Sequence, residues 1–297
     1  MAPLSGHLSI SNGALCVELS LQGGGILSFQ REGQALLAQP LAAPGLASFP
    51  MLPFCSRIAQ GRLDCSGIRA QLKPNFPPEE HAIHGFGWQR QWHLVRSSAT
   101  TCTMELHHDA SMSKQTGWPW IFMARQHFEL TGDALSLSMT LNNLSGSSMP
   151  AGMGVHPHFP LDEHTRVNMP CQGRVKMSKG FLPELAMFRD GAWIDPLEHL
   201  PWQQGGLDQV YGWGKGLATI TWLNQDWSLM IKADSSMPHW IVYAPIDERF
   251  ICVEPSSHFP NAINAGSLSQ HEGGMRLLTP GEFWTAETIF KTVSTAR

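Results

Sequence analysis

The stretch FMARQHFELTGDALSLSMTLNNL, residues 122–144, decides the fold class of this chain. In its second half, leucine or methionine occupies each odd position from 135 to 141, and serine, threonine or asparagine occupies each even position from 136 to 142. Successive side chains of a strand point to opposite faces, so this alternation predicts a strand with one apolar face. Residues 131–133, Thr-Gly-Asp, form a turn signal before it, and residues 122–130 are also strand-like. We therefore expect a β-hairpin over 122–144.

The same pattern recurs along the rest of the chain. A second hairpin is expected over 218–234, with its turn at 224–226. Further strands are expected at 15–21, 101–107, 240–244, 250–253 and 284–291. No long segment has a sustained helical period, and nothing marks a linker, an internal repeat or a low-complexity tail. The prediction is an all-β fold, one large antiparallel β-sandwich domain over residues 1–297.

The composition narrows the classes of partner. Among the 297 residues, 28 glycines and 21 prolines suit many short strands joined by tight turns. The net charge is −4 and no basic run occurs, so a nucleic-acid partner is not expected. No apolar run of about 18 residues predicts a membrane span, and the N-terminus lacks the pattern of a signal peptide. The six cysteines include no Cys-x-x-Cys pair. We expect a cytoplasmic protein with a small polar ligand.

A carboxylate stands out in the segment RFICVEPSSHFPNAIN, residues 249–264. Glu254 follows an apolar, strand-like run, and Pro255 is expected to end that strand because proline has no N–H to donate to a sheet ladder. Carboxylates are rarely buried without partners. Glu254 is therefore either a strand-end residue that returns to solvent or a functional acid or base.

Two histidine pairs lie among glycines and prolines. His81 and His84 occur in HAIHGFGWQRQW, and His156 and His158 occur in GMGVHPHFPL. Each ring could be a structural hydrogen-bonding group at a loop or strand end, or part of a site. A His-x-His pair with a distant Glu and another His is also the ligand set of a cupin-like metal enzyme, although the spacing here is not diagnostic.

Taken in order, these segments resemble the aldose 1-epimerase family, the galactose mutarotases. The resemblance extends over nearly the whole chain, to LLTPGEFW at 277–284. Its ordered motif residues are Arg57 in LPFCSRIAQGRL, His84, His156, Asp208 in LDQVYGW, and Glu254. The family implies a β-supersandwich with an open sugar-binding cleft, no cofactor and no metal. Its active members interconvert the α and β anomers of free aldoses.

The resemblance also implies roles for the motif residues. Glu254 is the expected catalytic base and His156 the expected catalytic acid, and the sugar would be held by Arg57, His84 and Asp208. Opening a pyranose ring takes a proton from the C1 hydroxyl and delivers one to the ring oxygen, so a base and an acid must flank the sugar. At neutral pH we expect a nearby carboxylate, Asp208 or Glu254, to keep His156 protonated.

Two positions depart from the family pattern. Ser56 replaces an asparagine that often precedes the arginine, which leaves the sugar preference open. His158 replaces an aromatic residue that often follows the His-Pro pair, which places a second titratable ring beside the proposed acid. The roles of these two residues and of His81 stay open.

Several alternatives also stay open. A hexose-6-phosphate 1-epimerase would need extra cations at the cleft, for which the candidates are Arg62, Arg69, Lys73 and Arg90. A non-catalytic carbohydrate-binding protein of the same fold is a further possibility. Taken alone, Arg57 could be a surface ion-pair residue and Asp208 a turn residue. We expect a sugar ligand, a place in carbohydrate metabolism, and either a monomer or a homodimer.

Overall fold

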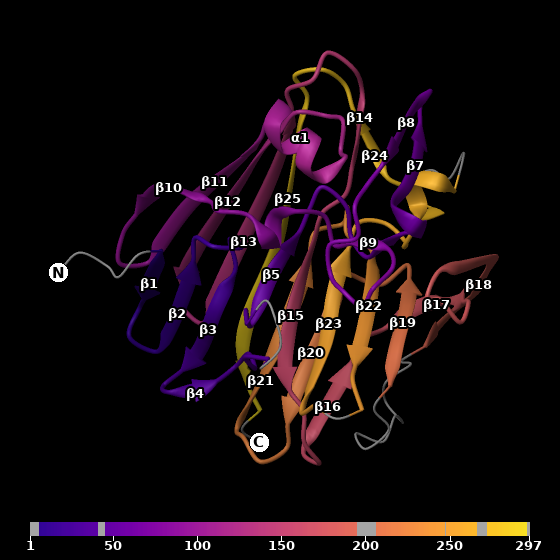
Figure 1. Cartoon of the computed structure of the whole chain (residues 1–297). Coiled ribbons are helices and arrows are strands. Elements are labelled where there is room, and N and C mark those ends of the chain that lie inside the picture. Colours follow the sequence, from indigo (N-terminus) through magenta and orange to yellow (C-terminus); the bar gives the residue numbers. More distant parts are fainter. Residues whose placement is uncertain (1–5, 41–44, 195–205, 247, 266–271, 296–297) are drawn as a thin grey trace.

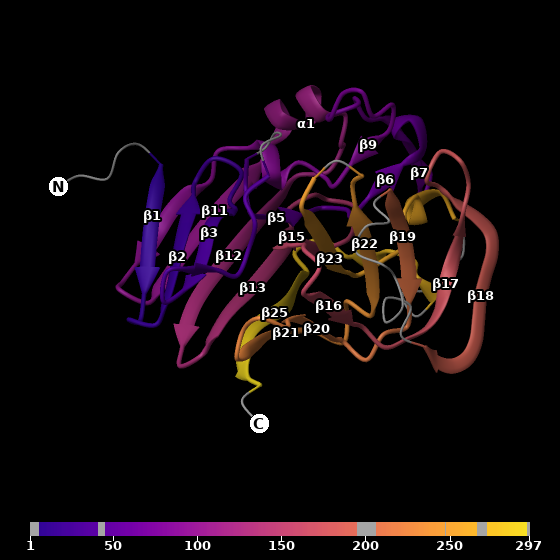
Figure 2. The same cartoon turned by 90° about the horizontal axis from the view of Figure 1, so that it is seen from below.

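Two large antiparallel β-sheets form the body of the molecule (Figure 1, Figure 2). The computed structural model describes residues 6–40, 45–194, 206–246, 248–265 and 272–295. The first sheet contains, in spatial order, β1 (His7–Ser11), β2 (Leu15–Ser20), β3 (Ile26–Arg31), β5 (Ser48–Met51), β15 (Gly154–Pro160), β23 (Phe250–Ser256), β22 (His239–Ala244), β19 (Leu207–Gly212), β17 (Cys171–Met177) and β18 (Pro183–Ile194), with β4 (Gln34–Ala35) beside β3.

The second sheet and a few short elements complete the described part of the chain. This sheet contains β10 (His93–Ser97), β11 (Thr101–His108), β12 (Phe122–Thr131), β13 (Ala134–Asn143), β25 (Phe283–Ser294), β21 (Trp227–Ala233), β20 (Leu217–Trp222) and β16 (Thr165–Asn168). The short elements are the pairs β14 (Met149–Ala151) with β24 (Arg276–Leu278), β6 (Arg57–Ile58) with β9 (Ala82–Ile83) and β7 (Arg62–Cys65) with β8 (Ile68–Gln71), the helix α1 (Ala110–Thr116), and the 3₁₀ turns η1 (Ala59–Gly61), η2 (Gly87–Gln89) and η3 (Ala262–Asn264).

The hairpin predicted from residues 122–144 is confirmed as β12 and β13, which pair antiparallel around the turn that joins Thr131 to Ala134. The apolar odd positions of β13 are buried, Leu135, Met139 and Leu141 completely so. Burial of each such side chain contributes about 1.5–3 kcal/mol relative to exposure. This apolar face therefore helps to hold the hairpin against the opposite sheet.

The core between the two sheets confirms the β-sandwich. Phe29 of β3 meets Phe290 of β25, with ring centroids 6.5 Å apart. The second predicted hairpin is present as β20 and β21. The other predicted strands occur within a few residues of their expected bounds. The extent of one domain over residues 1–297 stays a prediction. None of the helices in the described ranges is both long and apolar enough to cross a membrane.

Pro255 does not end its strand, so that prediction is wrong. β23 continues to Ser256, and Pro255 lies opposite Trp240 of β22. Regular pairing between β23 and β15 is missing between Ser256 and Cys252. This interval contains Pro255 on β23 and Pro157 on β15. Because neither proline has an N–H, the ladder is interrupted locally while both strands continue.

Candidate active site

Five neighbouring strands of the first sheet form the floor of the site: β5, β15, β23, β22 and β19 (Figure 1). Phe49 on β5 lies opposite His156 on β15, and Glu254 on β23 lies opposite Ile241 on β22. The register of β15 and β23 is the same on both sides of the prolines, which places His156 opposite Glu254. The flanking pairs that fix this register are Gly154 with Ser256 and His158 with Cys252.

A second row of side chains comes from positions two residues away from the first row on the same strands. His158 lies opposite Cys252, Cys252 opposite Tyr243, and Tyr243 opposite Asp208. Residues two apart on a strand share a face, so this row lies beside the first on the same sheet face. Asp208 is thus part of strand β19 and not a turn residue.

His156 and Glu254 contact each other at the centre of this face. Nε2 of His156 lies 3.2 Å from Oε1 of Glu254, and the Glu254 side chain is only 1% exposed. Phe49 stacks on the His156 ring with centroids 4.3 Å apart. Among the described residues, Nδ1 of His156 and Oε2 of Glu254 have no hydrogen-bond partner. A buried polar atom without a partner costs about 1–3 kcal/mol, so these two atoms mark a place where a polar ligand would be stabilising.

Burial sets the protonation of this pair. Burial raises the pKa of Glu254 well above its usual range, and the nearby charge of Asp208 raises it further. Burial also lowers the pKa of His156 well below its usual range, as do His158 and His84. Each group therefore favours its neutral form in the free protein. This differs from the expectation of a protonated His156, because burial and the two neighbouring histidines all disfavour a charge on this ring.

Arg57 lies between two carboxylates of the site, Glu79 and Asp208. Its Nε donates to Oε2 of Glu79 at 2.7 Å, and its Nη2 donates to Oδ2 of Asp208 at 2.9 Å. The ring of Phe181 lies 5.0 Å from the guanidinium carbon. Burial raises the pKa of Asp208, although Arg57 opposes that rise. The sequence reasoning missed Glu79, whose only local signal is an acidic pair directly after prolines 77 and 78.

His84 is held by the backbone of Ser56. The N–H of Ser56 donates to Nδ1 of His84 at 3.2 Å, and the N–H of His84 donates to the carbonyl of Ser56 at 3.0 Å. Burial, followed by Arg57 and His158, lowers the pKa of His84 to about 3. The ring is therefore neutral, and since Nδ1 accepts, Nε2 carries the proton and is a hydrogen-bond donor.

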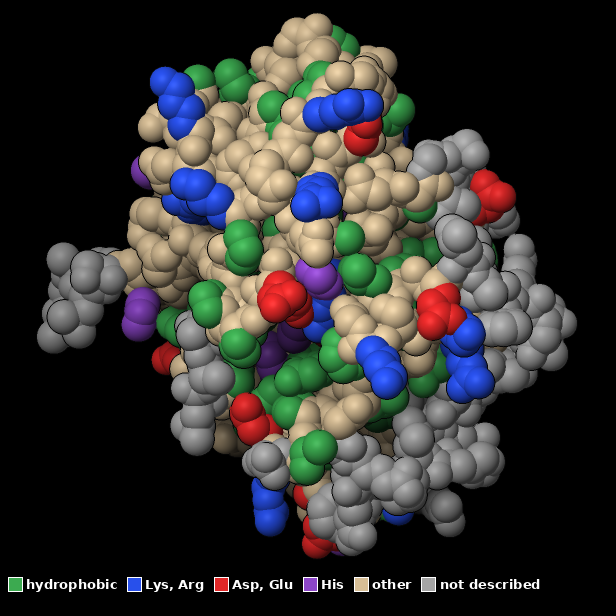
Figure 3. Space-filling view, turned by 45° about the vertical axis from the view of Figure 1, so that its right-hand side comes forward, with side chains coloured by type: hydrophobic (Ala, Val, Ile, Leu, Met, Phe, Trp, Pro, Cys, Tyr) green, Lys and Arg blue, Asp and Glu red, His purple; other side chains and the backbone are tan. Residues whose placement is uncertain are grey.

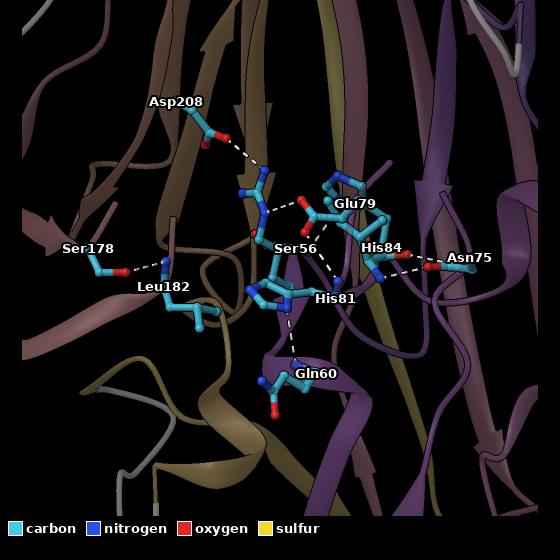
Figure 4. Close-up of polar contacts among 11 residues, drawn as sticks. Ser56, Gln60, Asn75, Glu79, His81, His84, Ser178, Leu182 and Asp208 are labelled. Atoms are coloured by element: carbon cyan, nitrogen blue, oxygen red, sulfur yellow. Dashed lines mark hydrogen bonds and ion pairs between the residues drawn. The ribbon is translucent and has the colours of Figure 1, made fainter. Parts of the chain in front are cut away.

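Gly85 and His81, two other residues of the loop that carries His84, show how this loop is shaped. Gly85 follows with φ +67°, and a Cβ there would overlap the carbonyl oxygen of Leu52. Only glycine fits this position, so the loop can carry His84 close to β5. His81, on the same loop, accepts a hydrogen bond at Nδ1 from the N–H of Gln60 at 3.1 Å (Figure 4).

The site lines a cavity of about 610 Å³. Figure 3 shows it as a hollow with histidine at its base and carboxylates and apolar side chains around it. All five residues named by the sequence reasoning are in its lining: Arg57, His84, His156, Asp208 and Glu254. Trp88 also lines it, whereas Trp92 is buried in the core.

The charges of the described lining are mostly negative. Its cations are Arg57 and Lys179, and its carboxylates other than the buried Glu254 are Glu79, Glu80, Asp208 and Glu248. The cations considered for a phosphate are not in this lining: Arg62, Arg69, Lys73 and Arg90. Two side-chain groups have potential metal-ligand atoms within 4.8 Å of one another: His84 with His156 and Glu254, and His156 with His158 and Cys252.

Comparison with known proteins relates this site to a family. A family model for aldose 1-epimerase matches residues 6–291. The uncharacterized protein YphB of Escherichia coli K12 is 29% identical over 296 residues, which cover 94% of this chain and 96% of YphB. A solved galactose mutarotase-like protein from Clostridium acetobutylicum has a TM-score of 0.82 at 16% identity, covering 97% of this chain and 95% of that one. Another from Lactobacillus casei has a TM-score of 0.80 at 17% identity, covering 97% and 100%.

The two structural likenesses show a shared fold. The family model covers nearly the whole chain, including every residue of the candidate site. This protein therefore belongs to the aldose 1-epimerase family.

Proposed function

We propose that the protein is a mutarotase, which interconverts the α and β anomers of a free aldose by opening and reclosing the sugar ring. The observation that carries this proposal is the buried contact between His156 and Glu254, two residues that line the cavity and each have one unpartnered polar atom. An acid and a base in contact can exchange a proton with each other as well as with a sugar. A place in carbohydrate metabolism and in the cytoplasm belongs to the same proposal.

The reaction needs a base and an acid, and the resting pair can provide both. Neutral His156 with protonated Glu254 carries the same number of protons as protonated His156 with ionised Glu254. Transfer of one proton across the 3.2 Å contact converts the first arrangement into the second. Glu254 then takes the C1 hydroxyl proton while His156 gives its proton to the ring oxygen. After rotation about the C1–C2 bond, the reverse transfers close the ring on the other face.

Three further residues would hold the sugar. Arg57 uses two of its five N–H donors on Glu79 and Asp208, which leaves others for sugar hydroxyls. His84 offers Nε2–H as a neutral donor, and Asp208 offers an acceptor. Arg57 lines the cavity, and because it is held at two points its remaining donors have a fixed orientation.

The charge of the lining favours a free sugar over a sugar phosphate. Arg57 is already paired with two carboxylates, and Lys179 is the other cation in the described lining. A 6-phosphate group would meet Glu79, Glu80 or Glu248 at least as readily as a cation, and like charges repel. Strong phosphate recognition usually uses converging arginines.

Exchange spectroscopy by NMR on a panel of free and 6-phosphorylated aldoses tests the proposal. We expect faster exchange between anomers for at least one free aldose than in a buffer control, and less acceleration for its 6-phosphate. If no sugar exchanges faster than the control, the mutarotase proposal is wrong. Calorimetric titration with the same sugars then decides whether the chain is a non-catalytic sugar-binding protein.

A further inference from the structure

A square of four side chains lies at the centre of the sheet face. β15 carries His156 and His158 two residues apart, and β23 carries Cys252 and Glu254 two residues apart. His158 is in register with Cys252, so the four side chains share one face. A His-x-His segment therefore lies directly opposite a Cys-x-Glu segment.

Three members of this square are close enough to ligate one metal ion. One ring nitrogen of His156, one of His158 and Sγ of Cys252 lie within 4.8 Å of one another, and all three residues are buried. Imidazole nitrogen and thiolate sulfur are the ligands that Zn²⁺ prefers, at about 2.0–2.3 Å. A small inward adjustment of these side chains would bring the three atoms to that distance around one ion.

A hydrogen bond to the backbone prepares the His158 imidazole for this role. Nδ1 of His158 lies 3.1 Å from the carbonyl oxygen of Ala47. That oxygen can only accept, so Nδ1 carries the proton and Nε2 carries the free lone pair. A backbone carbonyl on the second nitrogen is the usual arrangement of a metal-binding histidine. The buried Nδ1 of His156 has no hydrogen-bond partner in the described part of the chain, and Cys252 forms no disulfide.

We propose that His156, His158 and Cys252 form an inhibitory binding site for Zn²⁺ or a similar borderline-soft divalent ion. Binding replaces the proton on Sγ of Cys252 with a metal–sulfur bond and releases that proton to solvent. The bound ion occupies His156 and stops this ring from exchanging protons with a sugar. The inhibitory effect rests on the proposed function, whereas the binding itself does not.

Co²⁺ is a suitable probe of binding, because a cobalt–thiolate bond gives a charge-transfer absorption. We expect about one Co²⁺ per chain with this absorption, and its displacement by Zn²⁺. Cys252→Ser should abolish the absorption. Cys102→Ser should preserve it, since Cys102 is an equally buried cysteine on β11 of the other sheet. His158→Phe, which keeps the sulfur, should weaken binding by about tenfold or more.

Two results would overturn the binding site: no uptake of Co²⁺ by the folded wild-type protein, or an absorption that survives Cys252→Ser. Thermal melting of each variant shows whether it is folded. If Cys252→Ser does not fold, metal binding by His158→Phe provides the test of the site.

The inhibitory part is tested by anomer exchange in the presence of Zn²⁺. We expect Zn²⁺ to slow the wild-type protein, and the Cys252→Ser variant to require about tenfold more Zn²⁺ for the same effect. Unchanged exchange in a protein that has bound the ion would overturn inhibition. Metal binding without any exchange activity in the metal-free protein would instead overturn the proposed function and leave the binding site intact.

Discussion

Two carboxylates on the same sheet face, Asp208 and Glu254, are held in opposite ways. Asp208 is ion-paired with Arg57 at 2.9 Å, and Arg57 is paired in turn with Glu79. Glu254 contacts no guanidinium in the described structure and faces His156, whose own pKa is lowered by burial. A carboxylate beside a fixed cation is suited to positioning, whereas one beside a neutral imidazole is suited to proton exchange.

The largest effect should come from removing the exchangeable proton of Glu254. For Glu254→Gln we expect kcat to fall by about 10²- to 10⁴-fold with little loss of sugar binding, because the amide keeps the shape but cannot act as a base. Exchange spectroscopy and calorimetric titration measure the two quantities. Glu129→Gln, an exposed change on β12, is the control. Near-normal turnover of Glu254→Gln would show that another residue is the base.

Asp208→Asn should affect binding more than turnover. The substitution removes the charge that accepts hydrogen bonds from Arg57 and, as proposed, from the sugar. Loss of a hydrogen bond to a charged group costs about 1.5–3 kcal/mol. We therefore expect KM to rise by about tenfold or more while kcat changes less. Glu79→Gln should cause a smaller rise, because Asp208 still holds Arg57. Asp64→Asn, at the exposed pair with Arg69, is the control. A loss of kcat equal to that of Glu254→Gln would contradict the distinction between the two carboxylates.

The two carboxylates should also differ in how they link stability to pH. The pKa of Glu254 is raised well above its unfolded value, so between about pH 4.3 and the folded pKa the native state binds a proton that the unfolded state has lost. This contribution lowers the free energy of unfolding by up to about 1.4 kcal/mol for each pH unit of rise. Buried histidines contribute in the opposite direction, since the pKa values of His84 and His158 are lowered to about 3 and about 4.

Urea unfolding at pH 5, 6 and 7 measures this linkage. Glu254→Gln removes the opposing contribution, so its free energy of unfolding should rise with pH more steeply than that of the wild-type protein. Asp208→Asn should change the slope less, because Arg57 opposes the rise of the Asp208 pKa. Equal slopes for the wild-type protein and Glu254→Gln would show that Glu254 is ionised in the native state.

Ser56→Asn should have the smallest effect. Ser56 has φ +52°, a conformation that asparagine tolerates, and it holds His84 through its backbone. We expect kcat to stay within about twofold, with any change confined to the relative KM of different aldoses, since the longer amide adds one possible hydroxyl contact. Steady-state kinetics on the sugar panel measures this, with Ser66→Asn, at another left-handed position in a surface turn, as the control. A large loss of kcat would mean that the Ser56 hydroxyl itself takes part.

Much of the fold and the membership of the site could be predicted from the sequence. The alternation in β13 and the turn before it gave the hairpin, and the ordered motifs indicated the residues that now line one cavity. Pro255 misled because a strand can continue through a proline when the ladder to one neighbouring strand is interrupted there, as it is here toward β15. Glu79 was missed because its use depends on contact with Arg57, which no local pattern indicates.

The sequence by itself determined the strands, the hairpins and the family, because period-two alternation, turn residues and motif order are local properties of the chain. Only the tertiary structure decided that Phe49, His156 and Glu254 lie in one row, because the register of strands so far apart in the chain depends on how the whole sheet assembles. Only burial decided that Glu254 and His156 favour their neutral forms, since desolvation depends on the surrounding packing and not on the neighbours in sequence.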